Sequence, residues 1–439
     1  MLAAFDRFCI TPPLGGTWPE AFIDLRCGVL DDVHARLLWV DAGTDQEGGA
    51  ALLVSLDVLI VGLPELQRLE TALVQATGLA DEAIWIMVSH SHSAPIVGAI
   101  DDYTGLGPYW QDVCGQLGAI AGKLRHRLQP VRMERGTGAC DFNVNRRLPG
   151  PDGCSMRPNL EAVCDKDVPV LAFRAEDDTL VGLCYSYCCH PTILLGPQIS
   201  GDYPGQTSLA LEAEHDGSVA LFLPGTFGNI RPHLVDEQGD FRRDCTADDV
   251  ADCARQLQAA VNQALATAAP CTVDAVVAHR VLHDLPLDPL PTTDEIDEIL
   301  RLQWQDPAQL PPVTVHQQLG LRNWAQSVEA ARAQPPTGMA FRFSYLALGP
   351  VQFVGMSGEF FLEYGIRAKQ IFAADAIALG YTNGCQSYIP TDRALIEGGY
   401  EPGAWKRFGQ MAPFAHGVEA AVGEGLLRLQ AVVEQGPIR

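Results

Sequence analysis

The sequence has 439 residues, 47% hydrophobic and 19% charged, a composition typical of a globular protein with a large core. Its formal net charge of −24 disfavours nucleic acids and anionic membrane surfaces as partners. It contains no apolar run of the roughly 18 residues that a membrane span requires. Residues 1–7 lack the basic and apolar regions of an export signal, so we expect a cytoplasmic protein.

The 13 cysteines are odd in number and show no Cys-x-x-Cys spacing. Cys184, Cys188 and Cys189 cluster, and two of the three fall in an expected buried strand. Buried thiols in a reducing compartment are the simplest interpretation. A structural zinc site built on cysteines is disfavoured, because the paired spacing of such sites is missing.

Apolar runs and helical periodicity alternate along the chain. Strands are expected within residues 51–61, 85–95, 131–145, 218–223, 271–287, 341–354 and 376–381, with a hairpin at 168–189 turning at 176–178. Helices are expected at 64–77, 109–128, 205–214, 247–267, 361–372 and 418–434, and over 292–332 with a break near the prolines at 307–312. This order predicts an α/β fold with mixed β-sheets flanked by helices, in a single large domain spanning 1–439.

The stretch Trp85-Ile-Met-Val-Ser-His-Ser-His-Ser-Ala-Pro95 begins as a buried strand and ends with two histidines. Side chains in a strand repeat every two residues, so His90 and His92 should point the same way. Pro95 removes a backbone donor and should end the strand. Two neutral imidazoles at a strand end could begin a zinc site. The alternative is a pair of polar side chains that bond to the backbone.

Three later segments place candidate ligands after strands. His190 follows Cys-Cys and precedes proline, Glu359 follows a Gly-Met-Ser-Gly turn, and Tyr388 lies in a loop after another strand. Carboxyl ends of strands in α/β proteins gather at one edge, so with His90 these residues could bind Zn²⁺ through nitrogen and oxygen. Each also has an ordinary structural role open to it: a backbone contact for His190, an exposed turn for Glu359 and partial burial for Tyr388.

Ten short motifs follow one another along the chain between Ile10 and Glu401. They are Ile10-Thr-Pro-Pro-Leu-Gly, Asp32-Val-His-Ala-Arg, Ser-His90-Ser-His92-Ser-Ala-Pro, Asn143-Val-Asn-Arg146, Cys-His190-Pro-Thr, Ser200-Gly-Asp-Tyr-Pro-Gly, Gly225-Thr-Phe-Gly-Asn-Ile-Arg-Pro, Gly358-Glu359-Phe, Tyr388-Ile-Pro-Thr and Gly-Gly-Tyr400-Glu401. In this order the sequence resembles the catalytic domain of neutral (non-lysosomal) ceramidases and of bacterial proteins that share it.

The resemblance implies a zinc hydrolase that acts on linear amide bonds. Carried over residue by residue, it implies His90, His190, Glu359 and Tyr388 as zinc ligands. It also implies roles near the reacting carbonyl for His92, Arg146 and Tyr400, so that His92, Arg146, Tyr388 and Tyr400 are the candidate catalytic residues.

A mechanism follows from these assignments. Zinc lowers the pKa of bound water to about 7, so zinc-bound hydroxide would attack the amide carbonyl. Arg146 and Tyr400 are expected to stabilise the oxyanion, and His92 to pass a proton to the leaving amine. Asp202 either orients a ligand or caps the helix that follows it, and both interpretations stay open.

The sequence departs from the ceramidase pattern in several places. Ser91 and Ala94 replace the family's Thr and Gly in the histidine motif. We also expect this protein to lack the immunoglobulin-like C-terminal domain of ceramidases. A cytoplasmic chain of this kind has poor access to membrane lipid, so a small and soluble amide is the expected substrate.

The loop Gly-Asn229-Ile-Arg231-Pro-His233 contains the departure with the clearest chemical meaning. Ceramidases have a serine where this chain has Arg231, and arginine pairs with carboxylates through two parallel hydrogen bonds. Asn229, Arg231 and His233 are therefore predicted to bind a substrate that can carry a carboxylate. The alternative is a surface arginine paired with Asp236 or Glu237.

The function predicted from the sequence is zinc-dependent hydrolysis of the N-acyl bond of a small molecule. Three alternatives stay open: acyl transfer or amide condensation at the same zinc, a true ceramidase acting on N-acylsphingosine, and a non-enzymatic ligand-binding protein. The sequence leaves the acyl group, the amine and the oligomeric state undetermined.

Overall fold

The computed structural model describes residues 1–14, 28–43, 49–98, 107–195, 198–303 and 312–436. The first five-stranded sheet has the order β6-β4-β3-β1-β8. Its strands are β1 (Leu2–Cys9), β3 (His34–Asp41), β4 (Ala50–Leu56), β6 (Ile84–Val88) and β8 (Gln129–Pro130). β1, β3 and β4 pair antiparallel, whereas β4 and β6 pair parallel, so the carboxyl ends of β4 and β6 lie at the same edge.

The second five-stranded sheet has the order β15-β13-β12-β9-β17. Its strands are β9 (Arg132–Ala139), β12 (Asp167–Arg174), β13 (Leu180–Tyr187), β15 (Val219–Pro224) and β17 (Ala269–Cys271). β12 and β13 form the predicted hairpin, and β13 pairs parallel with β15. The loops after β13 and β15 therefore leave the sheet side by side.

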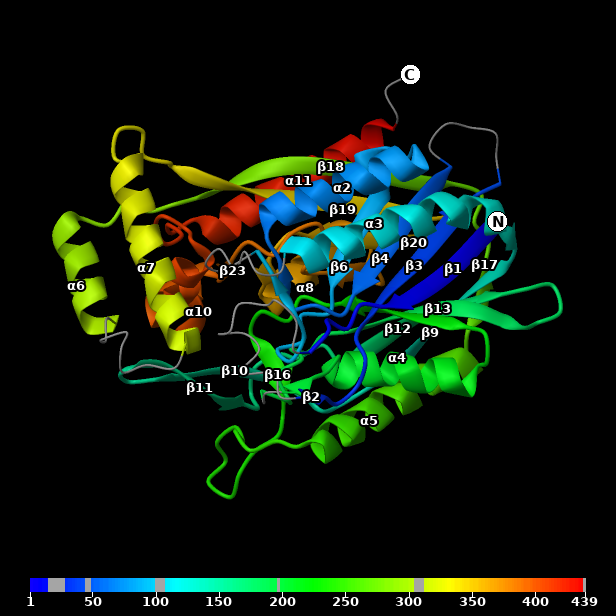
Figure 1. The fold of residues 1–439 in the computed structure, drawn as a ribbon, viewed down its shortest axis with the longest axis horizontal. Coiled ribbons are helices and arrows are strands. Elements are labelled where there is room, and N and C mark those ends of the chain that lie inside the picture. The colour runs from blue at the N-terminus through cyan, green and yellow to red at the C-terminus, as the bar shows by residue number, and fades with distance from the viewer. Residues whose placement is uncertain (15–27, 44–48, 99–106, 196–197, 304–311, 437–439) are drawn as a thin grey trace.

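These two sheets pack face to face, with helices on their outer faces (Figure 1). Helices α2 (Leu63–Thr77) and α3 (Gly107–Leu124) cover the first sheet, and α4 (Asp202–Glu214) and α5 (Ala247–Ala266) cover the second. Alternate residues of β4 divide between two cores: Leu53 packs between the sheets, whereas Leu52 and Val54 pack under α2 and α3. Burial on both faces explains why these strands appear in the sequence as continuous apolar runs.

A third sheet, of order β18-β19-β20-β22, extends the central core. Its strands are β18 (Val276–Pro286), β19 (Gly338–Leu348), β20 (Val351–Met356) and β22 (Ile377–Leu379), and helices α8 (Leu362–Ile371) and α11 (Val418–Gln435) pack on it. The segment 341–354, expected to be extended, contains two strands separated by a turn. Gly349 has φ +55°, a left-handed conformation that turns the chain and makes β19–β20 a hairpin.

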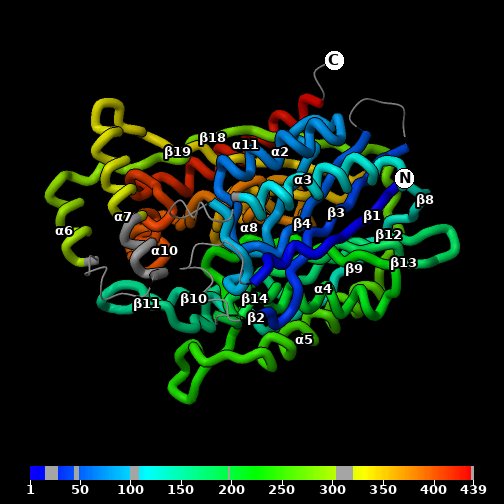
Figure 2. Tube along the Cα trace, viewed as in Figure 1, coloured from blue at the N-terminus to red at the C-terminus, as the bar shows by residue number. Residues whose placement is uncertain are grey.

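The remaining elements are short strands and peripheral helices. The strands are β2 (Gly28–Val29), β5 (Ile60–Val61), β7 (Ile96–Val97), β10 (Asn143–Gly150), β11 (Gly153–Asn159), β14 (Gln198–Ile199), β16 (Ile230–Pro232), β21 (Glu359–Phe360) and β23 (Tyr388–Ile389). The helices are α6 (Thr293–Gln303), α7 (Pro312–Ala331), α9 (Asp392–Glu397) and α10 (Tyr400–Gly403), with 3₁₀ turns η1 (Asp81–Ala83), η3 (Arg125–Arg127) and η5 (Ala404–Phe408). Helices α6, α7 and α10 gather at one end of the molecule (Figure 2). Most of the break predicted near 307–312 lies outside the described residues.

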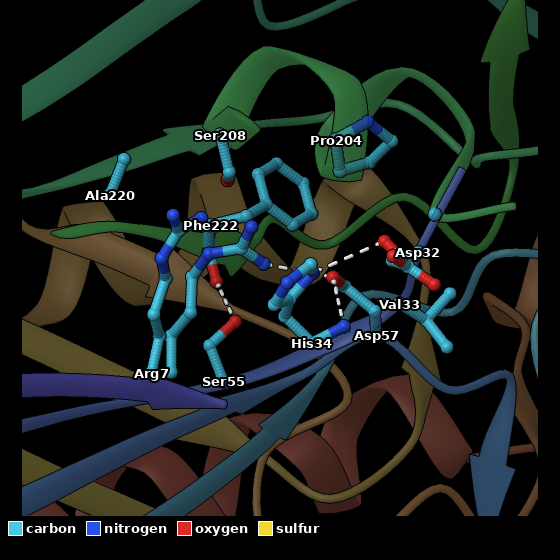
Figure 3. Close-up of polar contacts among 12 residues, drawn as sticks. Arg7, Asp32, Val33, His34, Ser55, Asp57, Pro204, Ser208, Ala220 and Phe222 are labelled. Atoms are coloured by element: carbon cyan, nitrogen blue, oxygen red, sulfur yellow. Dashed lines mark hydrogen bonds and ion pairs between the residues drawn. The ribbon is translucent and has the colours of Figure 1, made fainter. Parts of the chain in front are cut away.

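A network of buried ion pairs joins the first sheet to helix α4. Arg36 Nε donates to Glu212 Oε1 at 2.8 Å, and Arg36 Nη1 donates to Asp57 Oδ2 at 2.8 Å. Asp57 also accepts the backbone N–H of His34 (Figure 3). The more exposed Arg7 pairs with Glu212 as well. Burial disfavours the Arg36 cation, but Asp57 and Glu212 outweigh it and raise the pKa of Arg36.

The mixed α/β architecture in one large domain, with helices flanking several sheets, is confirmed. Within the described residues, no helix is long and apolar enough to span a membrane. The described cysteines are free thiols, and only Cys140, Cys184, Cys188, Cys189, Cys253 and Cys385 among them are buried.

Candidate metal centre

His90 lies just beyond the end of β6, in a left-handed backbone conformation with φ +64°. The expectation that the strand continues through His90 and His92 is wrong: β6 ends at Val88, because the left-handed residue breaks the extended chain. The His90 backbone N–H donates to Val58 O at 3.0 Å, and the His90 ring Nδ1 lies 2.7 Å from Leu59 O. A carbonyl only accepts, so Nδ1 carries the proton and Nε2 keeps its lone pair.

His190 follows β13 and is held in the same manner. Its backbone N–H donates to Ile230 O at 3.1 Å, and its Nδ1 lies 3.0 Å from Phe227 O. Its Nε2 is buried and has no hydrogen-bond partner among the described residues. Burial, and then the nearby charge of Arg146, hold the pKa of His190 well below its usual value. His190 is therefore a neutral imidazole whose lone pair points into the protein.

Glu359 brings a carboxylate to both imidazoles. Its Oε2 lies 3.4 Å from the Nε2 of His90 and 3.4 Å from the Nε2 of His190. Glu359 is 1% exposed and does not lie on an open turn, which excludes that alternative. In the short parallel pair of β21 with β23, Glu359 lies directly opposite Tyr388.

Tyr388 lies between this carboxylate and Arg146. Its ring stacks on that of His190, with centroids 6.3 Å apart, and the Arg146 guanidinium lies 5.4 Å from the Tyr388 ring centroid. Burial and then the Glu359 charge raise the pKa of Tyr388, and the hydrogen bond from Arg146 opposes this shift. The structure thus brings the four predicted ligands together, although their role as metal ligands stays a prediction.

His92 completes a group of three histidines. Its ring centroid lies 5.2 Å from that of His90 and 5.4 Å from that of His190. One nitrogen from each ring lies within 4.8 Å of the others. His92 is only half-buried, whereas the other two are buried. This position fits a group that exchanges protons at the edge of the site, and ligation by His92 also stays open.

Arg146 is buried and already bonded to protein. On β10, its Nε donates to Glu401 Oε1 at 2.7 Å and its Nη2 donates to Gly228 O at 2.7 Å. The Arg146 cation also faces the ring of Tyr400, which is 39% exposed at the start of α10. The structure brings Arg146 and Tyr400 to Tyr388, as predicted. Their contact with a reacting carbonyl stays a prediction.

Two residues near the site were missed by the sequence analysis. The Tyr381 hydroxyl donates to Glu359 Oε2 at 3.2 Å, and the Tyr381 and His90 ring centroids lie 4.6 Å apart. Cys385 places its sulfur within 4.8 Å of ligand atoms of His90 and Glu359. Both belong to the segment after β22, where Tyr381 has φ +52°. The only sequence signal for this bend is the Gly-Tyr-Thr-Asn-Gly composition of the segment.

Asp202 is not the N-cap residue of α4, but its Oδ1 accepts the Tyr203 backbone N–H in the first turn of this helix at 2.6 Å. Among the described residues, no hydrogen bond or ion pair joins Asp202 to a histidine. Asp202 is the first residue of α4, and its Oδ2 accepts the backbone N–H groups of Ile193 and Leu194, each at 3.0 Å. Burial raises the pKa of Asp202 to about 6, although these backbone donors favour its ionised form. Asp202 thus fixes the segment that follows His190.

The predicted substrate-binding residues lie in the segment around β16. Asn229 is buried: its Oδ1 accepts the Leu362 backbone N–H and its Nδ2 donates to Glu363, each at 2.9 Å. These bonds give Asn229 a structural role. His233 is exposed, and its backbone N–H donates to Phe142 O at 2.6 Å. Substrate contact by Asn229, Arg231 and His233 stays a prediction.

The fold can be compared with known proteins. No protein-family model matches the sequence, and a search of curated proteins gives no significant relative. The chain is similar to the crystal structure of neutral ceramidase from Pseudomonas aeruginosa, with a TM-score of 0.71 and 18% identity over 100% of this chain and 75% of that one. A structure of ceramidase complexed with C2 gives a TM-score of 0.71 and 16% identity, over 99% of this chain and 75% of that one. At these identities the likeness establishes the fold, and the expected ceramidase-like fold is confirmed.

Proposed function

We propose that this protein is a zinc-dependent amidohydrolase that cleaves the N-acyl bond of a small amide. The observation that carries the proposal is the convergence of three electron-pair donors in a buried space: His90 Nε2 and His190 Nε2 each lie 3.4 Å from Glu359 Oε2. Both imidazoles bond to backbone carbonyls through Nδ1, the usual way in which a metal-binding histidine is oriented. The fold shared with ceramidases supports the same proposal.

The donor set fits zinc. His90, His190 and Glu359 would hold the ion, and Tyr388 would supply a fourth ligand or a hydroxyl beside it. Bound zinc supplies a Lewis acid that polarises an amide carbonyl and makes water acidic enough to react at neutral pH. The buried and unpaired Nε2 of His190 is the clearest sign of fit, because a buried polar atom without a partner is costly.

The neighbouring side chains have separate tasks in this proposal. His92 accepts a proton from the attacking water and returns it to the leaving amine, a task that an imidazole can perform because one of its ring nitrogens can bind and release a proton. The Tyr388 hydroxyl donates a hydrogen bond to the carbonyl oxygen of the amide, which gains negative charge during the attack. Arg146 is a positioning residue: its bonds to Glu401 and Gly228 fix the guanidinium that bonds to Tyr388.

The test measures zinc and amide cleavage in the wild type, His190→Ala and a control. Purified wild type should contain about one zinc per chain and hydrolyse members of a panel of N-acyl amines and N-acyl amino acids. His190→Ala should retain far less zinc and show negligible hydrolysis, because the remaining donors are too few. His215→Ala is the matched control, because His215 follows α4 and lies outside the donor cluster.

Full zinc occupancy with full activity in His190→Ala would contradict the proposal. Zinc-loaded wild type that hydrolyses no amide in the panel would also contradict it. Product analysis with and without an added amine separates hydrolysis from acyl transfer, because only transfer forms a new amide with the added amine.

A further inference from the structure

Arg231 is unusual among the arginines of this acidic chain. Within the described residues, every other arginine that is not exposed pairs with a carboxylate; these are Arg36, Arg135, Arg146, Arg147, Arg174, Arg242, Arg280 and Arg342. Arg231 is partly buried, makes no ion pair with any described residue, and has a buried Nε without a hydrogen-bond partner. Its guanidinium therefore has unused donors, which are costly to leave unpaired.

The alternative partners predicted for Arg231 are not used. Asp236 instead accepts the backbone N–H groups of Gln238 and Asp240, each at 2.9 Å, and so closes its own turn. Glu237 is exposed and forms no ion pair with Arg231. The interpretation of Arg231 as one half of a surface ion pair is therefore wrong for the described chain.

The backbone of Arg231 lies in a segment that contacts the candidate metal centre. It follows Ile230, whose carbonyl accepts the backbone N–H of His190 at 3.1 Å. It pairs across the β10–β16 ladder with Val144, two residues before Arg146. Burial, and then the nearby Arg146 cation, lower the pKa of Arg231 to about 10, so Arg231 stays protonated at neutral pH.

An aromatic ring holds the guanidinium in place. The Arg231 Cζ lies 4.3 Å from the centroid of the Phe241 ring, and a β-bridge between Val235 and Phe241 closes the loop that carries this ring. A cation stacked on an aromatic face keeps its N–H groups free at the edge of its plane. The result is an oriented cation without an ion-pair partner among the described residues, on the strand whose Ile230 carbonyl holds the His190 backbone.

We propose that Arg231 binds a carboxylate of the substrate, so that the preferred substrates are amides with a free carboxylate, such as N-acyl amino acids. This inference rests on the proposed amidohydrolase function. The planar guanidinium matches the two carboxylate oxygens with two parallel hydrogen bonds, and a neutral amide offers no equivalent group. The carboxylate also supplies the negative charge that Arg231 lacks in the described chain.

The experiment measures binding separately from cleavage. Metal-free protein is titrated by calorimetry with N-hexanoylglycine and with the neutral N-hexanoylethanolamine, which has a similar length. Wild type should bind the glycine compound about 10-fold to 100-fold more tightly, the range expected of a charge-assisted pair. Arg231→Ser should remove this preference and leave the affinity for the neutral probe nearly unchanged.

Two further variants make the test specific. Arg231→Lys keeps the positive charge but loses the planar guanidinium, so it should keep part of the preference for the carboxylate probe. This variant also provides the test if Arg231→Ser folds poorly. Arg243→Ser removes one exposed cation close to Arg231, and it should keep the full preference. Equal affinity of wild type for the two probes, or binding of neither, overturns the inference. Equal loss of both probes in Arg231→Ser and Arg231→Lys also overturns it, because Arg231 then holds the loop.

Cleavage assays on the zinc-loaded enzyme separate this inference from the proposed function. If wild type cleaves both compounds with equal kcat/KM, the proposed amidohydrolase function is supported and the proposed carboxylate preference is contradicted. If no amide is cleaved but the binding preference persists and depends on Arg231, the carboxylate site is supported and the proposed amidohydrolase function is contradicted.

Discussion

Two groups of buried charged and polar side chains differ in whether their hydrogen-bond donors and cations are paired with acceptors inside the group. In the network around Arg36, one cation lies between the carboxylates of Asp57 and Glu212, and donors meet acceptors. In the group around Glu359, a carboxylate faces two imidazoles whose Nε2 atoms are also acceptors, because their protons lie on Nδ1.

The difference shows how structural and functional charge can be distinguished. A buried ion network that is internally matched needs no further component, and its cost appears when one member is removed. Within the described residues, the acceptors of His90, His190 and Glu359 have no cation among them and receive only the hydrogen bond from Tyr381 to Glu359, so a bound cation would stabilise them further. Burial alone does not separate the two, since Arg36, Asp57, His90 and Glu359 are each exposed by 2% or less.

The largest expected effect tests the matched network. Arg36→Leu should lower the free energy of unfolding by about 3–5 kcal/mol, because Asp57 and Glu212 would keep buried charges without their cation. Urea denaturation of metal-free protein measures this loss. Glu359→Gln in the same assay should change stability by less than about 1 kcal/mol, because the carboxylate has no cation to lose. A similar large loss in both variants would contradict the distinction between the two groups.

The second expected effect distinguishes ligand from proton carrier within the histidine group. His92→Ala should keep its zinc but lose turnover by about 10²–10⁴-fold, the contribution expected of a placed acid–base group. Metal analysis and kcat on the same sample give both values, and His90→Ala is the comparison. If His92→Ala loses zinc while His90→Ala keeps it, the two roles are reversed.

The smallest expected effect concerns Glu401, which forms ion pairs with Arg146 and Arg147 beside the candidate metal centre. Burial disfavours the Glu401 carboxylate, but the two arginines outweigh it and lower its pKa. Glu401 therefore contributes stability above its unfolded pKa, near 4.5, and this contribution is lost as the pH falls through the lower folded value. Glu401→Gln should cost about 3 kcal/mol at pH 7, in the range for breaking a buried pair.

Urea denaturation across pH 3–7 follows this contribution. The difference in unfolding free energy between wild type and Glu401→Gln should be largest above about pH 5 and shrink as the pH falls, because protonation then removes the same charge from wild type. A difference that stays constant over this range would show that Glu401 acts by packing and not by charge.

Much of the fold could be predicted from the sequence, because strands that are buried on both faces appear in it as continuous apolar runs. The hairpin at 168–189 and the helices at 64–77 and 247–267 are examples. Strands β1 and β3 were missed. β3 carries Arg36, a buried charge that is tolerated because it pairs with Asp57 and with Glu212, and Glu212 is 176 positions away in the sequence. No local pattern indicates such a partner.

The four candidate ligands could be named from the sequence, but their geometry could not. His90, His190, Glu359 and Tyr388 each follow a strand, and the resemblance to ceramidases joined them into one set. The strand expected at His90 fails because its φ is positive, and the contact of Tyr381 with Glu359 depends on another left-handed residue. Arg231 could be named from the sequence, but its lack of a partner appears only in the structure.

The pairing of β21 with β23 has a consequence for biogenesis. Glu359 and Tyr388 are adjacent in this ladder, whereas His90 and His190 come from distant parts of the chain. Contacts between such distant segments form late, because closing long loops is entropically costly. The complete set of candidate donors therefore exists only after the sheets have docked. If these residues bind zinc as proposed, the ion would enter a site whose geometry the folded core has already fixed.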